Sequence, residues 1–139
     1  MDVAETLLLD NEPFEVSRAA AWLDDLLGNA GLSPRVIATL HVVLDEVLNN
    51  ILNHAYADLE SHQIEIRLTS GNAAVTLEFL DDGVPFDPTQ HESAPPPRQD
   101  ADVRAGGLGL LFVRRLMDEV TFQRVDDRNH LTLRKFASL

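Results

Sequence analysis

Three polar residues at fourfold spacing could act together on a ligand. Glu46, Asn50 and His54 fall within a helical apolar pattern, so a carboxylate, an amide and an imidazole would rise along one face of a helix. A solvated polar stripe on an amphipathic helix would show the same spacing. Asparagine is a mediocre helix former, however, and Asn49, Asn50 and Asn53 crowd the middle of this segment, which favours a functional reason for them.

Two glycine-containing motifs follow at a distance along the chain. Asp81 and Gly83 end an apolar strand pattern, where a carboxylate could meet a ligand while the backbone passes close beside it. Gly106, Gly107 and Gly109 open an apolar helical pattern, and free backbone N–H groups at such a helix start can approach an anion. Each motif alone is weak, because the first could be a polar turn and the second a flexible hinge.

The elements that must position these residues are readable from hydrophobic periodicity. Helical spacing predicts helices over residues 14–27, 34–56 and 107–118, and alternation predicts strands over 3–9, 63–68, 74–80, 120–125 and 130–136. Residues 126–129 are expected to form the turn of the last hairpin, and the proline-rich segment 82–106 a long loop. This order predicts an α+β two-layer sandwich with helices on one face of a mixed, mostly antiparallel sheet.

The length, charge and composition of the chain exclude several classes of protein. The 139 residues suit a single domain over 1–139, and 23 acidic against 11 basic residues give a net charge of −12. Such a chain is not expected to bind nucleic acid or an anionic membrane. The absence of cysteine excludes disulfides and thiolate metal sites and suits the cytoplasm. With Lys135 as the sole lysine, near the end of the sequence, a P-loop is excluded and Schiff-base chemistry is not expected.

The three motifs in this order resemble the GHKL ATPase superfamily, whose ATP site is the Bergerat fold. Glu46, Asn50 and His54 match its N box, Asp81-x-Gly83 its first glycine box, and Gly107-x-Gly109 its second. The loop at about 82–106 matches its ATP lid. The stretches 86–88 and 107–118 look typical of the anti-sigma factor serine-kinase branch. Pro85 departs from the family, which often has glycine there, so the turn after Asp81 is expected to be stiffer.

The resemblance implies ATP and Mg²⁺ as cofactors and a role for each matching residue. Asp81 would accept a hydrogen bond from the adenine amino group, Asn50 would coordinate Mg²⁺, and Glu46 would act as general base. The backbone N–H groups of Gly107, Leu108 and Gly109 would bind the phosphates, and Gly83 would belong to the nucleotide site. His54 would have a structural role. These roles agree with the preference of Mg²⁺ for few hard oxygen ligands and with the demands of phosphoryl transfer.

The resemblance also implies partners. The substrate would be a serine of an anti-anti-sigma protein of the STAS class, the chain would hold a sigma factor, and it would form a homodimer. Arg18, on an otherwise acidic predicted helix, resembles a partner-contacting arginine of that branch, although an ordinary solvated arginine would look the same. Gyrase-like and receptor-kinase members need an adjoining domain, which we do not expect here. A non-catalytic ATP-binding switch stays the alternative, and Glu46 favours the kinase.

Overall fold

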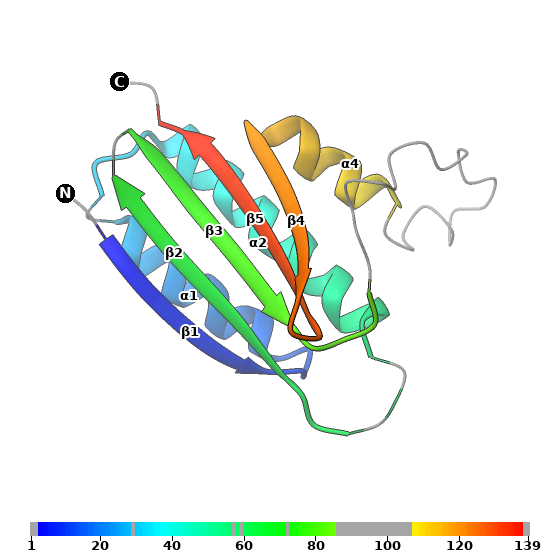
Figure 1. The fold of residues 1–139 in the computed structure, drawn as a ribbon. Coiled ribbons are helices and arrows are strands. Elements are labelled where there is room, and N and C mark those ends of the chain that lie inside the picture. The colour runs from blue at the N-terminus through cyan, green and yellow to red at the C-terminus, as the bar shows by residue number, and fades with distance from the viewer. Residues whose placement is uncertain are drawn as a thin grey trace.

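A five-stranded sheet forms one layer of the structure (Figure 1). In the order β1-β2-β3-β5-β4, its strands are β1 (Val3–Asp10), β2 (Gln63–Gly71), β3 (Ala74–Asp81), β5 (Arg128–Phe136) and β4 (Glu119–Val125). Every neighbouring pair is antiparallel, which confirms the α+β expectation and shows no parallel pair among the described strands. The computed structural model describes residues 3–28, 30–56, 58, 60–71, 73–85 and 107–137, so most of the expected lid at 82–106 lies outside the described residues.

Three helices cover one face of the sheet (Figure 1): α1 (Glu15–Leu27), α2 (Pro34–His54) and α4 (Gly107–Leu116). The α2 helix begins where expected, because the Ser33 hydroxyl accepts a hydrogen bond from the Val36 N–H at 3.2 Å and proline occupies the first helical position. Its apolar stripe lies against the sheet, with Leu40, Leu44 and Leu48 fully buried. None of the helices in the described part of the chain combines the length and apolarity needed to cross a membrane.

The hydrophobic core lies between the helices and the inner face of the sheet. Alternate residues of the central strands supply it, and Leu68, Leu77, Phe79 and Leu133 are at most 1 % exposed. The outer face of the sheet is polar and carries cross-strand ion pairs such as Arg128–Glu65 at 3.2 Å. The sheet therefore has one buried and one solvated face, as its alternating sequence predicts.

The expected four-residue turn at 126–129 is wrong. Only Asp126 and Asp127 form the loop, with φ angles of 53° and 62°, while Arg128 and Asn129 begin β5. Two consecutive positive φ angles match the tight turn whose twist suits a hairpin, and aspartate tolerates that conformation better than most residues. This shorter turn places Asn129 within the sheet, paired with Asp81 of β3.

Candidate nucleotide site

The polar stripe of α2 forms as predicted near the C-terminal end of that helix. Glu46 and His54 are exposed, and Asn50 is half-buried between them. Asn49, one residue earlier, faces solvent and donates a hydrogen bond to the Asp45 carbonyl at 2.9 Å. Asn50 is therefore the asparagine of this segment that combines partial burial with a place in the Glu46–His54 stripe.

Asn50 presents an amide oxygen suited to a ligand. Its Oδ1 atom is buried and has no hydrogen-bond partner among the residues that the structure describes. A buried polar atom without a partner costs free energy and therefore calls for a ligand or water. Because Mg²⁺ takes hard oxygen donors and often only one or two from protein, the orphaned oxygen fits the expected Mg²⁺ ligand.

Asp81 lies at the end of β3 and is only 4 % exposed. Its Oδ1 atom accepts two hydrogen bonds at 2.9 Å, one from the Gly83 N–H and one from Asn129 Nδ2. Burial raises the pKa of this carboxyl, while the bonds from Asn129 and Gly83 work in the opposite direction. Since both bonds fall on Oδ1, Oδ2 is left to accept a hydrogen bond from a ligand amino group.

Gly83 joins this carboxylate to the end of α2. A Cβ atom at Gly83 would lie 2.4 Å from the Ala55 Cβ and 2.5 Å from the Ala55 carbonyl oxygen, so no larger residue fits without moving backbone. The next residue, Val84, donates its N–H to the same carbonyl at 2.8 Å. The strand end that carries Asp81 and the helix that carries Asn50 are thereby held together. Pro85, the expected stiffening residue, is exposed just beyond this contact.

Two residues that the sequence analysis missed hold Asp81 and the following turn. Asn129 Nδ2 also donates to the Val84 carbonyl at 2.8 Å, and Arg124 Nη1 donates to the Gly83 carbonyl at 2.8 Å and to Asn129 Oδ1 at 3.1 Å. A two-residue turn at Asp126–Asp127 would have predicted that Asn129 lies in a strand. No local sequence pattern, however, indicates that Asn129 faces Asp81, which is 48 residues away along the chain.

A second missed cluster lies beside the first. The His62 ring stacks on Tyr56 with centroids 4.3 Å apart, and its two nitrogens lie 2.7 Å from Asp58 Oδ1 and 3.0 Å from Asp82 Oδ1. The Tyr56 hydroxyl is buried and has no hydrogen-bond partner among the described residues. Burial, followed by the charges of Asp81 and Asp82, raises the pKa of Tyr56, so its phenol stays protonated and able to donate to a ligand.

The glycine-rich motif begins α4 as predicted, since the helix starts at Gly107. Figure 1 shows α4 running antiparallel to α2, which places its N-terminus toward the C-terminal half of α2, where Asn50 lies. The first N–H groups of a helix have no partner within it and face outward from its end. Gly107, Leu108 and Gly109 thus lie on the helix end toward the other two motifs.

Arg18 lies apart from these motifs, on α1. Its Nη1 atom donates to the Leu8 carbonyl of β1 at 3.0 Å and to Glu15 Oε2 at 3.1 Å, while half of its side chain stays exposed. Glu15 is itself buried and accepts from the Asp10 N–H at 3.0 Å. Arg18 therefore ties the start of α1 to the edge strand, with a guanidinium still accessible from solvent.

Comparison with known proteins finds a matching family model and similar protein kinases. The model of the histidine kinase-like ATPase domain family matches residues 9–135. Serine/threonine-protein kinase BtrW of Bordetella bronchiseptica is 36% identical over 129 residues, covering 93% of this chain and 91% of that protein. Serine-protein kinase RsbW of Oceanobacillus iheyensis is 32% identical over 113 residues, covering 78% of this chain and 72% of that protein.

Two solved structures share the fold. One contains the RsbU and RsbW domains of Rv1364c from Mycobacterium tuberculosis, with a TM-score of 0.69 and 19% identity, covering 99% of this chain and 33% of that chain. The other is the SiaB-SiaC complex from Pseudomonas aeruginosa, with a TM-score of 0.53 and 17% identity, covering 93% of this chain and 88% of that chain. The expected resemblance is confirmed: the chain belongs to the histidine kinase-like ATPase domain family, in its serine-protein kinase branch.

Proposed function

We propose that the protein transfers the γ-phosphoryl group of ATP to a serine of a STAS-type anti-anti-sigma protein and sequesters a sigma factor. The observation that carries the proposal is that the Gly83–Ala55 contact holds the strand end with Asp81 against the end of the helix that carries Asn50. Asp81 contributes a carboxylate oxygen left for a ligand, and Asn50 a buried amide oxygen without a partner among the described residues. The serine-kinase names of the relatives support the same activity.

In this proposal the nucleotide lies between the end of β3 and the start of α4. Asp81 Oδ2 accepts a hydrogen bond from the adenine amino group, while Oδ1 stays engaged with the protein. The backbone N–H groups of Gly107, Leu108 and Gly109 bind the phosphates at the positive end of the α4 dipole. Mg²⁺, when bound, neutralises phosphate charge, and Asn50 is the residue that would hold it.

Glu46 would supply general-base catalysis in this site. It is exposed one turn before Asn50, so a serine hydroxyl from a second protein can reach it. As the serine oxygen bonds to the γ-phosphorus, its proton passes to the Glu46 carboxylate. The bond from the γ-phosphorus to the bridging oxygen breaks, and ADP leaves with that electron pair.

The STAS protein and the sigma factor are proposed as partners on the basis of the relatives. The serine-kinase branch acts on proteins, and the SiaB-SiaC structure is a complex of two proteins. Arg18 would contact a partner through its exposed part, and a homodimer is the expected assembly. With no cysteine and a net charge of −12, the protein would work in the cytoplasm, away from nucleic acid and membrane.

The test is phosphoryl transfer from radiolabelled ATP to the cognate STAS protein, measured for wild type and Glu46→Gln. The variant keeps the size of the side chain but loses its basicity, so transfer should fall by about 10²–10⁴-fold while ATP affinity by calorimetry stays within error. Asn50→Ala should weaken binding as well. Unchanged transfer in Glu46→Gln would reject the general-base role. ATP binding without transfer by wild type to a verified partner would instead favour a non-catalytic ATP-binding switch.

A further inference from the structure

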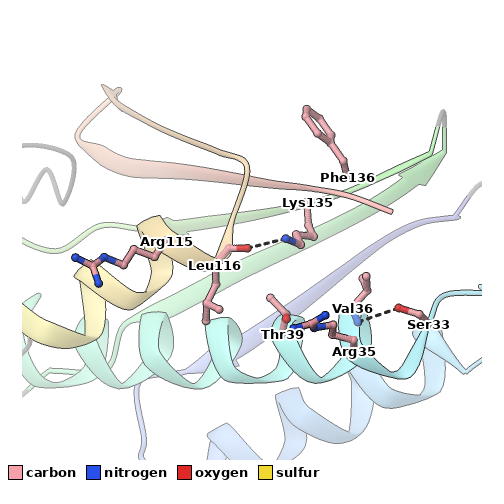
Figure 2. A pocket seen from close by; sticks show the side chains of 8 residues that line it. All are labelled: Ser33, Arg35, Val36, Thr39, Arg115, Leu116, Lys135 and Phe136. Atoms are coloured by element: carbon pink, nitrogen blue, oxygen red, sulfur yellow. Dashed lines mark hydrogen bonds between the residues drawn. The ribbon is translucent and has the colours of Figure 1, made fainter. Parts of the chain in front are cut away.

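A second candidate site lies at the other end of α2. A pocket of about 390 Å³ opens between the first turns of α2, the C-terminal end of α4 and the last residues of β5 (Figure 2). Arg35 on α2, Arg115 on α4 and Lys135 on β5 all line it. Arg35 and Asn50 are 15 positions apart, so at 1.5 Å per residue the pocket is about 20 Å from the nucleotide site.

The cations of this pocket differ from the rest of the chain. Of 11 basic residues, Arg98 and Arg104 lie outside the described part, which leaves 11 − 2 = 9. Seven of these nine make a polar or electrostatic interaction within the protein: Arg18, Arg67, Arg114, Arg124, Arg128, Arg134 and Lys135. Among the described residues, Arg35 and Arg115 are the two without one. Both line this pocket, in a chain whose net charge is −12.

Lys135 adds a third positive charge that is only partly compensated. Its Nζ atom donates to the Leu116 carbonyl at 2.9 Å, at the end of α4 (Figure 2). The same atom lies 3.8 Å from Asp118 Oδ2. Phe136 is also among the lining residues, but Figure 2 shows its ring pointing away from Lys135, and the ring lies 5.5 Å from the Arg134 guanidinium. Arg35 and Arg115 come from different helices and lie apart in Figure 2, so an extended segment with several carboxylates can meet both, whereas one small anion cannot.

We propose that this pocket docks an acidic segment of a partner protein, with carboxylates against Arg35 and Arg115. Charge complementarity argues for this occupant, because an acidic segment is repelled by most of the surface and attracted to this one place. The pocket shares α2 and α4 with the nucleotide site but none of its residues. The inference therefore does not rest on the kinase activity.

The test uses a short fluorescein-labelled peptide of Glu, Leu and Ser, and a matched peptide in which Gln replaces every Glu. By fluorescence anisotropy, the acidic peptide should bind wild type more tightly than the neutral one. The double variant Arg35→Gln/Arg115→Gln should lose about tenfold in affinity for the acidic peptide. The control Arg67→Gln/Arg128→Gln carries the same charge change on the outer face of the sheet and should bind within about twofold of wild type.

Two further measurements locate the binding and separate it from the nucleotide site. In ¹⁵N spectra the acidic peptide should shift the amide signals of Val36 and Lys135 and leave that of Gly83 in place. ATP affinity of Arg35→Gln/Arg115→Gln should equal that of wild type. Equal binding of both peptides, or equal loss in the control variant, would overturn the proposal. So would shifts caused by inorganic phosphate alone, or a self-association of the protein that Arg35→Gln/Arg115→Gln abolishes while no peptide binds.

Discussion

Replacing Asn129 by alanine removes the side chain that fixes the buried carboxylate of Asp81. At least three hydrogen bonds go with it: Asn129 Nδ2 to Asp81 Oδ1 at 2.9 Å, Nδ2 to the Val84 carbonyl at 2.8 Å, and Arg124 Nη1 to Asn129 Oδ1 at 3.1 Å. Asp81 keeps one donor, the Gly83 N–H. The Asp81 carboxylate is then held less firmly. Because Asp81 is only 4 % exposed, water cannot fully replace the lost hydrogen-bond donor.

The magnitude follows from which of these bonds involve a charge. A hydrogen bond to a charged group is worth about 1.5–3 kcal/mol and a neutral one about 0.5–1.5 kcal/mol. Arg124 is exposed, so water can replace its bond, and the loss of the other two gives about 3 kcal/mol in the free energy of unfolding. For a domain of this size that lowers Tm by about 10 °C. ATP affinity should fall at the same time, because Oδ2 is no longer oriented.

The effect of this change should also depend on pH, with a definite sign. Burial already raises the pKa of Asp81, and Asn129 opposes that rise, so the alanine variant raises the pKa further. Protonation then stabilises the folded state of the variant up to a higher pH than it does for wild type. The difference in unfolding free energy between the two proteins should therefore grow as pH rises through the raised pKa of Asp81, and shrink in acid.

Urea denaturation at several pH values measures this difference, and calorimetry measures ATP affinity. Thr132→Ala is the control, since it truncates a side chain of the same strand, half-buried on the outer face of the sheet. An Asn129→Ala variant as stable as Thr132→Ala would show that Asn129 does not support Asp81. A large destabilisation that is constant with pH would show that the loss does not pass through the Asp81 carboxylate.

Three further outcomes follow from the same geometry. Gly83→Ala should lower the free energy of unfolding by about 1–3 kcal/mol and abolish measurable ATP binding in calorimetry, because the new Cβ would lie 2.5 Å from a backbone oxygen. The control Gly31→Ala has open space around it at a φ of 72°, so it should lower the free energy of unfolding by about 1 kcal/mol and bind ATP normally. Asp81→Asn should weaken ATP by at least about tenfold, and an unchanged affinity would contradict the adenine contact. The hydrogen bond of His62 with Asp58, and to a lesser extent that with Asp82, raises the pKa of His62. Its NMR titration midpoint should exceed about 6.5, and its stabilising contribution should disappear as pH rises through that midpoint; a midpoint at or below 6.5 would contradict this.

Local sequence determined the elements and the motifs they carry. The fourfold spacing of Glu46, Asn50 and His54 is a property of any α-helix, so their common face needed no tertiary information. A serine before a proline marked the start of α2, and three closely spaced glycines marked the start of α4. These signals lie within a few residues of one another, where the backbone has few alternatives, and the order of elements was therefore predicted correctly.

Tertiary structure alone decided which side chains meet. Asn129 faces Asp81 because β5 pairs with β3 in one register, and Gly83 meets Ala55 because a strand end packs on a helix end. Arg35 and Lys135 share a pocket although 100 residues separate them along the chain. Such contacts are selected by burial of the whole core and by one choice of sheet register. Because that choice depends on the summed packing of many residues, no short stretch of sequence encodes it.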